Sequence, residues 1–125
     1  AVPVAMPAGT AKVTFTSGTT GTPKGVCLGQ AAMDRVAQAI GEATAALDIT
    51  RHLSVLPFAV LLENIAGVLA PRRRQATCIA VPLASVGLHG SSRFDPAQLQ
   101  AAVESWQPHS LILLPQMLRA WTMWL

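Results

Sequence analysis

One ordered glycine-rich stretch stands between two short apolar runs: Phe15-Thr16-Ser17-Gly18-Thr19-Thr20-Gly21-Thr22-Pro23-Lys24-Gly25-Val26. Its glycines permit positive φ angles and let the backbone approach an anion closely, so that successive N–H groups can point at phosphate oxygens. The serine and threonine hydroxyls add neutral donors, and Lys24 adds a positive charge. The stretch therefore predicts a phosphate-binding loop over residues 15–26.

The spacing of the glycines excludes two common phosphate-binding motifs. A Walker A loop needs Gly, four residues and then Gly-Lys-Ser/Thr. Here Pro23 occupies the position of the second glycine, and Gly25 follows Lys24 in place of Ser or Thr. A Rossmann loop needs G-x-G-x-x-G, whereas Gly18, Gly21 and Gly25 are spaced three and four residues apart.

Residue for residue, the stretch resembles the signature of the adenylate-forming superfamily, which includes acyl-CoA synthetases, luciferases and the adenylation domains of nonribosomal peptide synthetases. The family pattern is an aromatic or apolar residue, Thr-Ser-Gly-Thr-Thr-Gly, any residue, and Pro-Lys-Gly. Every fixed position of that pattern is present between Phe15 and Gly25. Such complete agreement is not typical of a Gly/Ser/Thr linker.

Two further segments carry a weaker resemblance. Residues 56–67 are similar to the Leu-Pro-Leu segment that follows the phosphate loop in this family, and Glu63-Asn64 is most similar to the long-chain fatty acyl-CoA synthetase branch. Val60 departs from that branch, which commonly has a histidine there. Residues 94–118 are similar to the segment that precedes the family's adenine-binding strands.

The resemblance implies an ATP-dependent acyl-CoA synthetase, that is, an AMP-forming fatty-acid:CoA ligase that uses ATP, Mg²⁺, a fatty acid and coenzyme A. The loop would hold the β- and γ-phosphates as the leaving pyrophosphate, with Lys24 as a cation near the phosphates or as a loop anchor. The expected ATP phosphate-binding residues are Thr16, Ser17, Gly18, Thr19, Thr20, Gly21 and Lys24.

Three residues are expected in the vicinity of the acyl substrate: Phe58, Val60 and Glu63. For Glu63 two roles stay open, because it could face an acyl tunnel or form a hydrogen bond to a strand end. We favour the structural role, since buried carboxylates are retained mainly where they are paired.

The family's downstream motifs do not follow Leu118 in this sequence: the Tyr-Gly-x-Thr-Glu segment, the ribose-binding aspartate, the hinge arginine and the C-terminal lysine. We therefore expect residues 1–125 to form a single partial domain, a fragment of the family's large N-terminal domain, without a catalytic residue and inactive in pyrophosphate exchange. Two alternatives stay open: a non-catalytic remnant that binds a nucleotide or a protein, and a fragment of an amino-acid or aryl-acid adenylating enzyme.

Composition restricts the partners. With 51% hydrophobic and 12% charged residues the chain is too apolar for disorder, yet it has no uninterrupted apolar run long enough to span a membrane. The basic run at residues 72–74 lacks interleaved aromatic residues and predicts a solvated loop, not a nucleic-acid surface. The three histidines lack partners at metal-ligand spacing, so no metal site is expected. The apolar end at residues 121–125 favours self-association.

Cys27 and Cys78 make neither a C-x-x-C motif nor a disulfide framework, and we expect both to be buried, reduced thiols of a cytoplasmic protein.

Apolar runs and helical patterns alternate along the chain. Strands are expected at 12–16, 25–28, 51–56, 76–81 and 110–114, and a loop or hairpin at 86–93. Helices are expected at 30–47, at 61–69 with Pro71 as the stop, from Asp95 to Pro108, and from Pro115 or Gln116 onward. This order predicts an α/β fold with a partial, mostly parallel sheet covered by helices on both faces.

Overall fold

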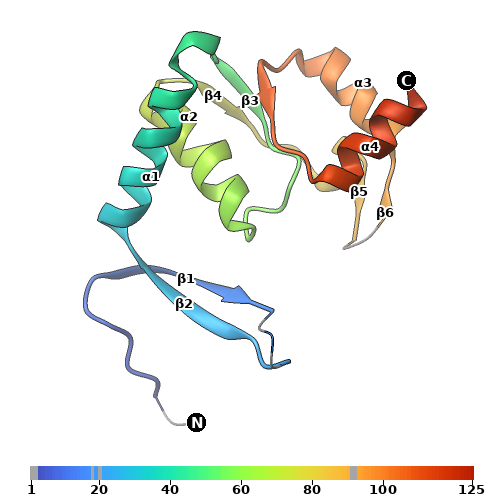
Figure 1. Ribbon diagram of the computed structural model, residues 1–125. Coiled ribbons are helices and arrows are strands. Elements are labelled where there is room, and N and C mark those ends of the chain that lie inside the picture. The colour runs from blue at the N-terminus through green and yellow to red at the C-terminus, as the bar shows by residue number, and fades with distance from the viewer. Residues whose placement is uncertain (1–2, 18, 20, 91–92) are drawn as a thin grey trace.

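The computed structural model describes residues 3–17, 19, 21–90 and 93–125. Near the N-terminus, strands β1 (Thr10–Thr16) and β2 (Lys24–Gly29) form an antiparallel hairpin, which leads directly into helix α1 (Gln30–Ala43). The hairpin extends away from the remaining elements (Figure 1). The phosphate-loop stretch therefore joins two strands, as the sequence predicts.

The centre of the fold is a parallel sheet of three short strands: β3 (Arg51–Leu53), β4 (Thr77–Ile79) and β7 (Ser110–Leu111). Their order is β4-β3-β7, so the chain starts in the middle, moves to one edge and then crosses to the other. Because parallel crossovers are almost always right-handed, connections that run in opposite directions place their helices on opposite faces. Figure 1 shows α1 and α2 on one side of the sheet and α3 and α4 on the other.

The two crossovers differ in composition. The first is one continuous helical stretch, the π-helical segment η2 (Glu63–Leu69) followed by α2 (Ala70–Arg73). The second contains the short helix η3 (Leu83–Val86), the small hairpin β5 (Leu88–His89) and β6 (Arg93–Phe94), and helix α3 (Pro96–Trp106). Helix α4 (Pro115–Trp124) follows β7. This alternation confirms the predicted α/β class.

Each face of the sheet has its own apolar core. Leu53, Val55 and Leu99 belong to the cluster on the α3 and α4 side, whereas Ala37 and Ile65 belong to the cluster between α1 and η2. Successive side chains of a strand point to opposite faces. The alternation along β3 therefore directs His52 toward η2 and Leu53 toward α3.

The strands of the parallel sheet are shorter than the apolar runs that predicted them. Residues 51–56 were expected as one strand, but the ladder of β3 ends at Leu53, while Val55 and Leu56 are buried in the core beyond it. The run at 110–114 is likewise paired only over residues 110–111. Apolar runs report burial, and burial extends past the residues that find a strand partner.

The prediction that Pro71 stops the preceding helix is wrong. Pro71 is the second residue of α2 and lies inside the continuous helical stretch formed by η2 and α2. The wide turns of η2 precede it, with the Ala70 N–H donating to the Ile65 carbonyl. The Cys78 thiol donates to the Gly67 carbonyl, four residues before the proline, at 3.4 Å. In an α-helix, any residue other than proline at position 71 would donate its N–H to this carbonyl.

The start of α3 agrees with its sequence signals. Asp95 is the N-cap, and its carboxylate accepts hydrogen bonds from the N–H groups of Ala97 and Gln98 at 3.0 and 3.3 Å. Helix α1, in contrast, ends earlier than expected, at Ala43, before a separate short turn, η1 (Ala45–Leu47).

The expectation that both cysteines are buried holds only in part. Cys78 is partly buried, but Cys27 is exposed, because it lies in the hairpin, whose strands are largely open to solvent. Both are free thiols. In the part of the chain that the structure describes, no helix has the length and apolar character to cross a membrane.

Candidate functional site

The base of the phosphate-loop stretch is fixed by the register of the hairpin. Thr16 lies opposite Lys24 in the last pair of the ladder, and Phe15 lies opposite Gly25. A Cβ atom on Gly25 would approach the Phe15 ring to 3.3 Å and a Val13 methyl group to 3.2 Å. The absence of a side chain at position 25 therefore lets the Phe15 ring lie across the partner strand. Two residues of the motif thus lie against each other at the base of the loop.

The loop itself presents donors to solvent. Gly21 has φ +78°, in the left-handed region that favours glycine. Ser17, Thr19 and Thr22 are exposed, as is Lys24. Between described residues the ion pairs are His52–Glu63 and Arg73–Asp34, so Lys24 belongs to neither. Gly18 and Thr20, two of the expected phosphate-binding residues, lie outside the described residues.

The loop is not placed at the start of a helix. The whole length of β2 separates Lys24 from the first residue of α1, a span of roughly 20 Å at about 3.3 Å per strand residue. In Walker and Rossmann loops the anion lies at a helix N-terminus. An anion bound at this loop would instead meet backbone N–H groups, hydroxyls and the lysine, which agrees with the exclusion of both motifs.

The three residues expected near an acyl substrate have different environments. Phe58 and Val60 lie in the turn before η2 and are 49% and 37% exposed. Glu63, the first residue of η2, is fully buried. Its Oε2 accepts a hydrogen bond from the Leu56 N–H at 3.3 Å. The structure therefore places Glu63 against the chain that continues from β3.

Glu63 belongs to a polar relay, Ser110–His52–Glu63, that the sequence did not reveal. Nε2 of His52 lies 3.0 Å from Oε1 of Glu63, and Nδ1 lies 2.9 Å from Oγ of Ser110. His52 is 2% exposed. His52 and Ser110 are register partners in β3 and β7, 58 positions apart in the sequence, and only the strand pairing brings them together.

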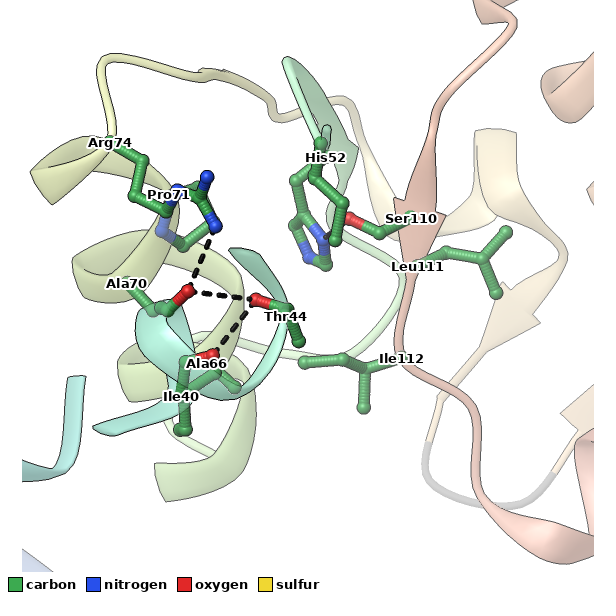
Figure 2. A pocket seen from close by; sticks show the side chains of 12 residues that line it. Ile40, Thr44, His52, Ala66, Ala70, Pro71, Arg74, Ser110, Leu111 and Ile112 are labelled. Carbon is green, nitrogen blue, oxygen red and sulfur yellow. Dashed lines mark hydrogen bonds between the residues drawn. The ribbon is translucent and has the colours of Figure 1, made fainter. Parts of the chain in front are cut away.

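The relay lies at the wall of a cavity of about 180 Å³ between α1, α2 and β7. Figure 2 shows His52 and Ser110 on one side of this cavity and Arg74 on the other. The Arg74 guanidinium donates to the carbonyls of Gly41 and Ala45 at 2.8 and 3.3 Å. The remaining walls are mostly apolar, so the cavity is a site distinct from the hairpin loop in both position and chemistry.

The thiol of Cys78 lies close to the same helix as Glu63. Its pKa is raised, first by burial, which disfavours the thiolate, and further by the negative charge of Glu63. The positive charge of Arg72 acts in the opposite direction. Cys78 is thus held as a thiol, consistent with its donation to the Gly67 carbonyl.

The chain offers no evident magnesium ligands of its own at the loop. Residues 15–26 contain no Asp or Glu, and within the described ranges no three His, Cys, Asp or Glu side chains gather as a metal site. Mg²⁺ is commonly bound through one or two carboxylates together with substrate phosphates. At this loop the phosphates alone could carry the ion.

Comparison with known proteins gives one match. A protein-family model described as AMP-binding enzyme matches residues 2–124. No curated protein and no solved structure matches the chain. The matched region includes the hairpin loop and the parallel sheet.

Proposed function

Because this chain belongs to the AMP-binding enzyme family, within the adenylate-forming superfamily, we propose that it is the phosphate-holding part of an ATP-dependent acyl-CoA synthetase. In the proposed reaction a fatty acid carboxylate attacks the α-phosphate of ATP, which gives an acyl-adenylate and pyrophosphate. The acyl group then passes to the thiol of coenzyme A with release of AMP. The glycine-rich hairpin loop is the observation that carries this proposal.

The loop would hold the β- and γ-phosphates as the leaving pyrophosphate. Its left-handed Gly21, its exposed hydroxyls and Lys24 at the mouth opposite Thr16 supply donors of the kinds that bind phosphate. Donors held in place before the reaction stabilise charge as it develops on the leaving group. We assign this role to Thr16, Ser17, Gly18, Thr19, Thr20, Gly21 and Lys24.

The acid substrate of the proposed enzyme is a fatty acid. Phe58 and Val60 are apolar and exposed, so they can contact a hydrocarbon chain, whereas the Glu63 carboxylate is occupied inside the fold. Mg²⁺ would neutralise part of the phosphate charge, held by the phosphates and by ligands beyond the loop. Amino-acid or aryl-acid activation is the competing substrate class.

We also propose that residues 1–125 are part of the family's large N-terminal domain, and that the enzyme acts in the cytoplasm. No residue of the chain is assigned a catalytic role in adenylation. We therefore expect the 125-residue chain alone to give no pyrophosphate exchange with ATP and a fatty acid. Exchange above that of a loop-deleted variant would contradict this expectation.

The test of phosphate binding compares two lysines of the same hairpin by titration calorimetry. Lys24→Gln removes the positive charge at the loop mouth. The control Lys12→Gln removes one positive charge opposite Leu28, toward the other end of the ladder. We expect Lys24→Gln to weaken pyrophosphate and Mg-ATP binding about tenfold, roughly 1.4 kcal/mol. Lys12→Gln should change affinity less than about twofold, since exposed charges beyond about 10 Å are screened at 0.1 M salt.

Equal losses in the two variants would show that binding depends only on overall charge and would contradict the assignment of the loop. Absence of pyrophosphate and ATP binding by the unsubstituted chain would contradict it as well.

A further inference from the structure

The Ser110–His52–Glu63 relay has a definite order of donors and acceptors. An ionised carboxylate only accepts hydrogen bonds, and Glu63 already accepts one from the Leu56 N–H. With Glu63 as a carboxylate, the imidazole proton lies on Nε2, 3.0 Å from Oε1 of Glu63. Nδ1 is then a lone-pair acceptor, and the Ser110 hydroxyl, 2.9 Å away, donates to it. The serine proton thus points at a base.

The His52 ring is buried and is held between Glu63 and Ser110. His52 is 2% exposed and Glu63 0%, and both come from elements packed together, β3 and η2. A Cβ atom on Gly67 would overlap Oε1 of Glu63 and Nε2 of His52, so the glycine creates the space that the pair fills. A nucleophile, a base and a third group that orients the base are the parts of an activated hydroxyl. In this relay Nδ1 of His52 faces the serine hydroxyl and Nε2 faces the carboxylate. Either imidazole nitrogen can accept a proton, so Nδ1 can act as the base.

The cavity in front of Ser110 sets the size and chemistry of a ligand. Its volume is about 180 Å³, and its walls include Ile40, Ile49, Leu111 and Ile112. An apolar cavity of about 150 Å³ is large enough for a benzene ring. The cavity therefore suits a compact apolar group such as a butyryl or benzoyl chain. Arg74 lies at the side opposite Ser110 (Figure 2).

We propose that Ser110 is the nucleophile of a second site, separate from the phosphate loop, which accepts a small apolar acyl group from an activated ester or thioester. Oγ bonds to the carbonyl carbon while the hydroxyl proton passes to Nδ1 of His52. The bond from that carbon to the leaving oxygen or sulfur breaks, and the leaving group takes the proton from His52. The product is an ester of Ser110, and the Glu63 carboxylate stabilises the transient imidazolium.

A fluorophosphonate probe and p-nitrophenyl butyrate test this proposal on the 125-residue chain. With the probe, an Oγ–P bond forms, the P–F bond breaks, fluoride leaves and the serine proton passes to His52. Mass spectrometry is expected to find one adduct, on Ser110, with either reagent. Ser110→Ala should abolish it. The control Ser54→Ala removes another buried hydroxyl, which has no hydrogen-bond partner among the described residues, and should leave labelling unchanged.

Two variants show whether labelling depends on activation of Ser110 by the relay and on access through the cavity. Glu63→Gln, which keeps the shape but removes the charge behind His52, should slow labelling about 100-fold, the low end of general-base contributions. Ala66→Leu keeps the relay but fills the cavity that Ala66 lines, and it should also suppress labelling. Circular dichroism establishes which variants fold.

Unlabelled Ser110 in the unsubstituted chain would overturn the proposal, as would labelling of folded Glu63→Gln at the unsubstituted rate. If Glu63→Gln does not fold, Ala66→Leu decides: undiminished labelling of that variant would show that the cavity does not deliver the reagent.

Discussion

Gly67 shows how one missing side chain permits a buried, hydrogen-bonded pair of a carboxylate and an imidazole. The space that a methyl group would take at this position is filled by the Glu63 carboxylate and the His52 ring. A buried charge is tolerated only where partners replace the lost water, and here His52 and the Leu56 N–H do so. The glycine is therefore a requirement of the relay, although it lies inside a helix, where glycine is normally unfavourable.

Gly67→Ala should accordingly destabilise the fold by about 3 kcal/mol, the upper end of the cost of leaving a buried hydrogen-bonding group without its partner. The control is Gly41→Ala in α1, where the new methyl group would meet only the Arg74 side chain at 3.4 Å. That substitution should stabilise by up to about 1 kcal/mol, since alanine is the better helix former. Urea unfolding of both variants measures the difference. A Gly67→Ala variant as stable as the unsubstituted chain would show that the pair is not as closely fitted as described.

At the scale of a single element, the N-terminus of α3 rests on Asp95. Its carboxylate accepts two backbone hydrogen bonds and lies where the helix has unpaired N–H groups. Pro96 follows at a position where its missing N–H costs nothing. Both features are local in sequence, which is why the start of this helix could be predicted.

Asp95→Ala should cost about 1 kcal/mol of unfolding free energy, the usual loss for an N-cap. Asp34→Ala is the matched control, because both partners of Asp34, Arg73 at 3.6 Å and the Gln30 amide at 3.1 Å, lie at the surface. Exposed pairs contribute little, so that variant should change stability by less than about 0.5 kcal/mol. Equal effects of the two substitutions in denaturant titrations would argue against the cap as the source of stability.

The ends of other elements are set by contacts between residues that are distant in the sequence. Pro71 was expected to end its helix, but the π-helical turns before it and the Cys78 thiol beside the Gly67 carbonyl accommodate it. The three strands of the parallel sheet were located correctly but predicted too long, since apolar runs record burial and not pairing. Hydrophobic patterns thus sufficed for the kind and order of the elements, while their ends were decided by tertiary contacts.

For the whole molecule, the two sites differ in how far the sequence could predict them. The phosphate loop is continuous in sequence, so its residue types and spacing could be recognised directly. The relay joins β3, η2 and β7, and His52 meets Ser110 only through a strand register that the sequence does not state. No local pattern around either residue marks the pair.

Self-association through the C-terminal end of α4 stays a prediction. Met123, Trp124 and Leu125 are 82%, 49% and 75% exposed, which fits the expected self-association through this end. Light scattering of the chain measures it, and a monomer at high concentration would contradict it.

The central claim is that the hairpin loop holds the phosphates of ATP, and residue-resolved NMR tests it most directly. Amide signals of the ¹⁵N-labelled chain are followed during titration with pyrophosphate. The largest shifts should fall on the amides of residues 16–24, with the signals of Ser110 and of α3 and α4 unchanged. Shifts centred on the Ser110 cavity, or no shifts at millimolar pyrophosphate, would contradict the assignment of the loop.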